Sequence, residues 1–136
     1  KMSKSELSDF SRINLTDDKD LIINKIKKAK TDPLPIPSDI EELKRRPEAK
    51  NLLGIYSSLT DLSIEKSIQI FANKNFSEFK DELSQVLVEK IEPISVEIKK
   101  LINDKKYLEK VLFDGRQKAN DIASIKVKKL QEIVGF

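Results

Sequence analysis

The chain has 136 residues, of which 38% are hydrophobic and 36% charged, and its formal net charge is +3. It contains no cysteine, histidine or tryptophan, which excludes disulfides, thiolate nucleophiles, imidazole bases and the usual zinc ligands within these residues. No apolar run is long enough to span a bilayer and no signal peptide is visible, so we expect a cytoplasmic protein with no membrane contact. The mild positive charge permits a contact with RNA but does not require one.

The first five residues, Lys1-Met2-Ser3-Lys4-Ser5, combine two lysines with two hydroxyl groups and lie far from any apolar pattern. Such a segment suits a loop that closes on a polyanion, because ammonium and hydroxyl groups both donate to phosphate oxygens. Composition alone favours a solvated, lysine-rich segment. We expect the polar stretch as far as residue 16 to be a weakly ordered loop.

A helix is predicted over residues 18–30, with Asp18 as its N-cap and an apolar face that includes Ile22 and Ile26. Lysines are concentrated in its last turns, where cations are favoured by the helix dipole: Lys25, Lys27, Lys28 and Lys30. They either form an ordinary solvated face or a patch that faces phosphate.

Three prolines at alternate positions make residues 31–37 an extended joint. A capping-box pattern that begins at Ser38 then predicts a short helix to about Arg45. The densest positive run of the chain follows, at Lys44, Arg45 and Arg46.

Helical periodicity continues over residues 47–60, 63–73, 76–103 and 104–134. Gly54 lies inside the first of these helices and indicates a close helix crossing that would offset its poor helix propensity. The fold class predicted is therefore all-α: a helical bundle whose last two long helices are antiparallel, preceded by a polar loop.

Residues 1–5 match, at all five positions, the second signature of the class I aminoacyl-tRNA synthetases, K-M-S-K-S. Later stretches resemble the tryptophanyl-tRNA synthetase family in particular: K-I-K-K-A-K-T-D, R-P-E-A-K-N-L-L-G-I-Y-S and F-K-D-E-L-S-Q-V-L-V-E-K-I-E-P-I. Residues 6–12 lack the acidic, Asn, Pro and Gly residues usual there, and residues 38–46 are also atypical.

The resemblance implies a carboxy-terminal portion of such an enzyme, with a loop for the ATP phosphates at 1–17, a linking helix and joint at 18–37, and a helical anticodon-recognition domain at 38–136. ATP would be a substrate together with Mg²⁺, and this portion would bind no cofactor tightly and no metal of its own. In the loop, Lys1 and Lys4 would stabilise the charge that grows on the β- and γ-phosphates. Ser3 and Ser5 would orient the loop or donate to phosphate, and Met2 would anchor it.

The resemblance also implies three partners: tRNA(Trp), an upstream catalytic domain of the same polypeptide, and a second copy in a homodimer. The family's other nucleotide motif, H-I-G-H or a variant of it, belongs to that upstream domain, so the isolated chain should be inactive. The residues suited to tRNA contact are Lys44, Arg45, Arg46, Arg116, Lys118, Asn120 and Lys126.

Two interpretations of another class stay open at this point. The chain could be a free-standing RNA-binding helical module, although its interspersed charges argue against tight autonomous binding. It could also be a helix-bundle interaction domain with a chance match at residues 1–5, since amphipathic stripes are usually core.

Overall fold

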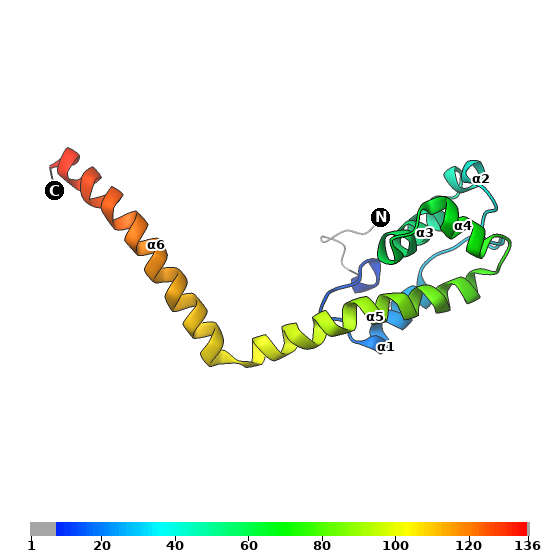
Figure 1. Cartoon of the computed structure of the whole chain (residues 1–136), viewed down its shortest axis with the longest axis horizontal. Helices are drawn as coiled ribbons and strands as arrows, with labels where there is room; N and C mark the ends of the chain where they lie inside the picture. The colour runs from blue at the N-terminus through cyan, green and yellow to red at the C-terminus, as the bar shows by residue number, and fades with distance from the viewer. Residues whose placement is uncertain (1–7, 136) are drawn as a thin grey trace. The chain divides into compact units, whose positions relative to one another are not determined.

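The computed structural model describes residues 8–135, and every regular element within them is a helix (Figure 1). A short 3-10 helix, Asp9–Ser11, precedes six α-helices: α1 (Lys19–Lys28), α2 (Ile40–Lys44), α3 (Pro47–Thr60), α4 (Ile64–Phe71), α5 (Phe76–Asn103) and α6 (Lys105–Val134). The predicted all-α class is confirmed, and each predicted helix end lies within two residues of the observed one.

The chain forms two compact units, Lys1–Val96 and Glu97–Phe136. The first contains the helices as far as most of α5, and the second contains the end of α5 and all of α6. The functional division into residues 1–17, 18–37 and 38–136 remains a prediction, as does the antiparallel pairing of the last two helices.

Side-chain caps explain where most helices begin. Asp18 accepts from the amide of Leu21 at 2.9 Å, and Asp104 accepts from the amide of Tyr107 at 3.0 Å. The capping box of α2 is centred on Asp39 rather than on Ser38: Asp39 accepts from the amide of Glu42 at 2.8 Å. Helix α3 begins differently, with Pro47 at its first turn, because proline has no amide that needs a partner there.

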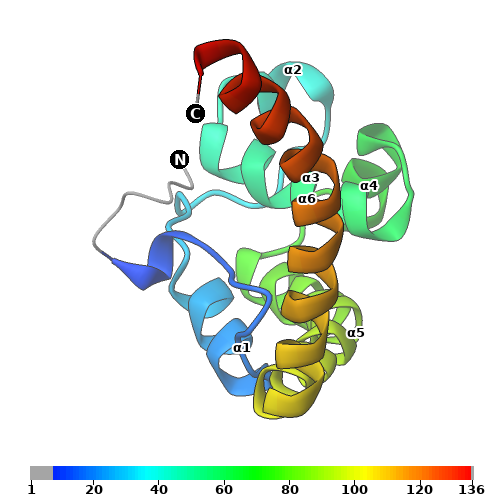
Figure 2. The same ribbon diagram turned by 90° about the vertical axis from the view of Figure 1, so that its left-hand side faces the viewer.

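The core of the first unit is one apolar cluster drawn from α1, the proline joint and helices α2 to α5. Tyr56, Phe71 and Phe79 meet edge to face in its interior, with ring centroids 4.8–6.0 Å apart. Helix α3 packs against α2 and α4, and α1 runs beside α5 (Figures 1 and 2). This arrangement joins α1 to helices α2 to α5 through shared apolar burial.

The prediction of a close helix crossing at Gly54 is wrong within the described residues. No heavy atom lies within 4 Å of the position that a Cβ would occupy at Gly54, nor at Gly115 in α6. Within α6 no described residue is buried, so the long apolar stripe of this helix contributes nothing to the core cluster. No helix among residues 8–135 is long and apolar enough to cross a membrane.

Candidate functional site

The signature that points to ATP lies at Lys1, Met2, Ser3, Lys4 and Ser5, outside the described residues. What the structure describes is the segment that follows, from residue 8 to residue 17, and its attachment to α1.

A single buried lysine of α1 holds both ends of this segment. The Nζ of Lys25 donates to Asp17 Oδ2 at 2.6 Å and to Asp9 Oδ2 at 2.7 Å. The Lys25 side chain is only 2% exposed and that of Asp17 only 4%. Asn14 completes the cluster. Its side-chain Nδ2 donates to Asp9 Oδ1 at 2.9 Å, and its backbone N–H donates to Asp17 Oδ2 at 2.9 Å. We call Asp9, Asn14, Asp17 and Lys25 the anchor cluster.

The anchor cluster changes the acidity of its members. Burial tends to lower the pKa of Lys25, but the hydrogen bonds and charges of Asp17 and Asp9 outweigh it and raise that pKa. The hydrogen bond from Lys25, helped by the one from Asn14, lowers the pKa of Asp9. The lysine and this carboxylate are therefore both charged at neutral pH, and the ion pair is intact.

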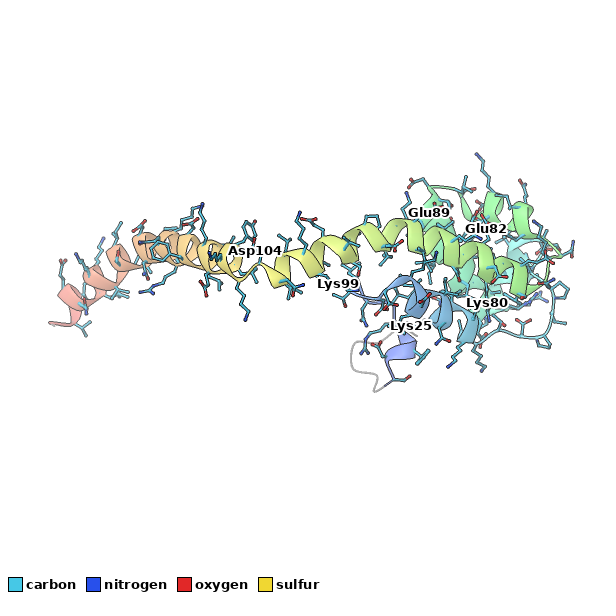
Figure 3. All side chains as sticks on the ribbon, turned by 90° about the horizontal axis from the view of Figure 1, so that it is seen from below. Lys25, Lys80, Glu82, Glu89, Lys99 and Asp104 are labelled. Carbon is cyan, nitrogen blue, oxygen red and sulfur yellow. The ribbon has the colours of Figure 1, made fainter. Side chains whose placement is uncertain are left out.

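Two expectations are corrected here. Lys25 belongs neither to a solvated face nor to a phosphate-facing patch, because its ammonium group is buried against two carboxylates (Figure 3). The stretch through residue 16 is also more defined than a weakly ordered loop, from residue 8 onward. Phe10 lies under the ammonium of Lys28, 4.7 Å from the ring centroid, and Arg12 pairs with Asp9 at 3.1 Å.

The proline joint is held by Arg46, one of the residues predicted to contact tRNA. Its guanidinium donates to both carboxylate oxygens of Asp32, at 2.6 and 2.9 Å, and to Glu42 Oε1 at 2.8 Å. It also donates to the carbonyl of Leu34 at 3.2 Å, and its side chain is 9% exposed. These contacts account for Arg46 without RNA, since most of its donors are already used.

A second buried lysine, Lys80 of α5, closes the end of α1. Its Nζ donates to the carbonyl of Ala29 at 2.7 Å and to that of Lys27 at 3.3 Å. These are carbonyls that the end of a helix leaves without intrahelical partners. Burial lowers the pKa of Lys80. The contact fixes the end of α1 against α5 (Figure 3).

Sequence reasoning missed Lys25 and Lys80, although a signal was present for both. Lys25 lies three residues after Ile22 and next to Ile26, on the buried face of α1. Lys80 lies next to Phe79 and three residues before Leu83, on the buried face of α5. A lysine on the apolar face of a helix needs a buried partner, which its sequence position alone does not name.

The other tRNA candidates are exposed. Lys44 pairs with Glu41 at 2.6 Å on the surface, and Arg45 is exposed beside it. In α6, all four candidates are exposed: Arg116, Lys118, Asn120 and Lys126. They do not share one face, because residues two apart in a helix are separated by about 200°. Arg116 and Asn120, four apart, form one pair, and Lys118 lies on a different face.

No group of three or more His, Cys, Asp or Glu residues that could hold a metal ion occurs within residues 8–135.

Residues 1–94 match the family model described as tRNA synthetases class I (W and Y). The chain belongs to this family. Among its relatives are the tryptophan–tRNA ligases of Rickettsia felis (50% identical), Mesorhizobium japonicum (46%) and Rhizobium meliloti (45%). Each alignment covers all 136 residues of this chain but only 41%, 38% and 38% of the respective relative.

The chain thus spans about two fifths of the length of the curated relatives it matches. The signature, the anchor cluster and Arg46 lie inside the part that matches the family model. Arg116, Lys118, Asn120 and Lys126 lie beyond it but within the alignments with the tryptophan–tRNA ligases. A helical module without any synthetase relationship is therefore not supported.

Proposed function

We propose that the chain is the carboxy-terminal part of a tryptophan–tRNA ligase. The observation on which this rests is 45–50% identity with such ligases over all 136 residues, including the complete K-M-S-K-S signature. The enzyme joins tryptophan to ATP as tryptophanyl-adenylate and then esterifies tRNA(Trp). The upstream part of the same polypeptide supplies the nucleotide fold and the tryptophan pocket, and the whole enzyme is a homodimer.

In the first step a carboxylate oxygen of tryptophan attacks the α-phosphorus of ATP. The bond from that phosphorus to the bridging oxygen breaks, and pyrophosphate leaves with the electron pair. Negative charge therefore grows on the leaving β- and γ-phosphates, where Lys1 and Lys4 place ammonium groups and Ser3 and Ser5 place hydroxyl donors. Met2 anchors the loop. Mg²⁺ enters with the phosphates as part of the substrate.

The test of this first step uses Lys4→Ala in the complete polypeptide that contains the chain. We expect tryptophan-dependent exchange of pyrophosphate into ATP in the wild type. In the variant, kcat should fall by about a hundredfold with the KM for tryptophan nearly unchanged, since the lost contact forms mainly in the transition state. Lys19→Ala, at an exposed lysine of α1, is the matched control. Near-normal turnover in Lys4→Ala would remove Lys4 from this role.

We further propose that exposed basic residues of the helical domain contact the anticodon end of the tRNA: Lys44, Arg45, Arg116, Lys118, Asn120 and Lys126. Phosphate contacts need lysine or arginine, and splayed bases stack on planar groups such as guanidinium. Arg116 is the strongest candidate for a base contact because Asn120 lies on the same helix face, where its amide adds both donor and acceptor. Arg46 is the weakest member of the original set, because its guanidinium already binds Asp32 and Glu42.

Aminoacylation by the complete enzyme distinguishes these roles. Arg116→Ala and Lys118→Ala are compared on tRNA(Trp) and on an anticodon variant. If Arg116 reads the anticodon, its loss should raise the KM for the normal tRNA by about tenfold and shrink the difference between the two tRNAs. A uniform effect on both tRNAs would leave Arg116 as a phosphate contact. An effect of Lys118→Ala alone would move the RNA to the other face of α6.

A further inference from the structure

The anchor cluster joins the segment that follows the signature to the helix that links it to the helical domain. We propose that Lys25 is a positioning residue for adenylate formation: by holding Asp9 and Asp17 together, it fixes the point from which the signature reaches the ATP phosphates. This inference rests on the proposed function. It assigns Lys25 a role through Asp9 and Asp17 and not through any contact with ATP, because its ammonium group is buried.

The sequence separation between the anchor cluster and the signature gives the proposal its basis. Asp9 lies four residues after Ser5, and its 2.7 Å contact with Lys25 ties it to α1. Without this contact Asp9 keeps its local partners Asn14 and Arg12, and Phe10 keeps its contact with Lys28. The next residue packed against the core cluster is Ile13, eight residues after Ser5. Loss of the contact therefore about doubles the length of chain between the signature and its first attachment to the core.

Under the proposed function, catalysis by Lys1 and Lys4 depends on the positions of their ammonium groups when negative charge develops on the leaving phosphates. Their stabilisation of the leaving phosphates acts at hydrogen-bond distance, and a displacement of about 1 Å lowers such contributions a hundredfold. A tether that doubles in length lowers the fraction of time in which the signature is placed correctly. Loosening the anchor should therefore lower kcat and leave the binding of tryptophan, which belongs to another part of the enzyme, largely unchanged.

The cluster is also costly as a device for stability alone. A buried ion pair loses hydration on both partners, and apolar residues of similar size are often as stabilising or more so. An aliphatic residue at position 25 could not bind the carboxylates of Asp9 and Asp17, which lie 16 and 8 residues earlier in the chain. The geometry thus favours a role in placing Asp9.

The experiment separates placement from stability with three variants of the complete polypeptide. Lys25→Met removes the ammonium group, and the triple variant Lys25→Met, Asp9→Asn, Asp17→Asn also removes the carboxylates that would be left without a partner. Lys80→Met is the matched control, since it removes a buried lysine that binds the end of α1 and does not touch residues 8–17. Thermal unfolding and tryptophan-dependent pyrophosphate exchange are measured at a temperature where every variant is folded.

Lys25→Met should lower both the Tm and kcat, with kcat falling about threefold or more, as a doubled connecting segment implies, and the KM for tryptophan changing less than about twofold. The triple variant should regain most of the Tm, because no buried carboxylate is left without its partner, and none of the kcat, because position 9 is still not held to α1. Lys80→Met should lower the Tm and leave kcat unchanged.

If kcat recovers together with the Tm in the triple variant, or if Lys80→Met lowers kcat as much as Lys25→Met does, the inference is overturned. An active wild type with an equally active Lys25→Met overturns it as well, and leaves the proposed function standing. A complete wild-type polypeptide without tryptophan-dependent exchange overturns the proposed function, and this inference with it.

Discussion

Three positive charges of the first unit are buried or nearly so, and each binds a segment that ordinary apolar packing would leave loosely placed. Lys25 holds residues 9–17, Arg46 holds the proline joint, and Lys80 holds the end of α1. Each is satisfied by several acceptors, which offsets the loss of hydration. At the scale of single residues, these side chains determine how residues 9–17 and the proline joint are held, and how α1 is joined to α5.

The joint gives a test that depends on pH. The hydrogen bond from Arg46 lowers the pKa of Asp32 below its ordinary value of 3.8. A carboxyl whose pKa is lowered by folding stabilises the folded state above its unfolded pKa, and this contribution is lost as the pH falls through the folded pKa. We therefore expect Asp32→Asn to lower the free energy of unfolding of the chain most at neutral pH, and progressively less below about pH 4.

The measurement is urea unfolding followed by circular dichroism at about pH 7, pH 4 and pH 2.5. Other carboxyls also titrate in this range, so the decisive quantity is the difference between wild type and variant at each pH. A difference that stays constant from neutral to acid pH would mean that the Arg46–Asp32 pair contributes no pH-dependent stability.

At the scale of helices, the sequence predicted the elements well because their signals are local. Asp18, Pro47 and Asp104 determine where three helices begin, and each acts within one turn of its own helix. The contacts that build the site are not local. Lys80 meets the carbonyl of Ala29 at a separation of 51 residues, and no periodic pattern specifies such a partner. The capping of the helices was therefore predictable, and the anchor cluster was not.

Gly54 illustrates how a local signal misleads. Its position within α3 suggested a close crossing, but the space beside it is open in the part of the chain described. Gly54→Ala should then raise the free energy of unfolding of the 136-residue chain by about 0.5–1 kcal/mol, because alanine has the better helix propensity and loses less backbone entropy.

Chemical denaturation of the two proteins measures this difference. Gly135→Ala is the matched control: Gly135 has a φ of +84° at the end of α6, where alanine is strained, so no gain is expected there. A loss of stability on Gly54→Ala would show that another segment packs against this face of α3 in solution.

At the scale of the molecule, the first unit combines one apolar core with the anchor cluster, which holds residues 9–17 against α1. The signature itself was found from sequence because its five residues are contiguous. The residues that would face it across the ATP belong, under the proposed function, to the part of the ligases that lies outside the 136 aligned residues.

The isolated chain should therefore show an all-helical circular dichroism spectrum and no tryptophan-dependent exchange of pyrophosphate into ATP. The physical reason is that two ammonium groups can stabilise a leaving group only when the nucleophile is held in line with it. That orientation is worth roughly 7–11 kcal/mol of the barrier and requires a pocket for tryptophan. The measurement is the incorporation of labelled pyrophosphate into ATP by the 136-residue chain, with the complete polypeptide as the positive control. Exchange above background by the chain alone would mean that the aligned residues already contain a tryptophan site, and would contradict the division of labour proposed here.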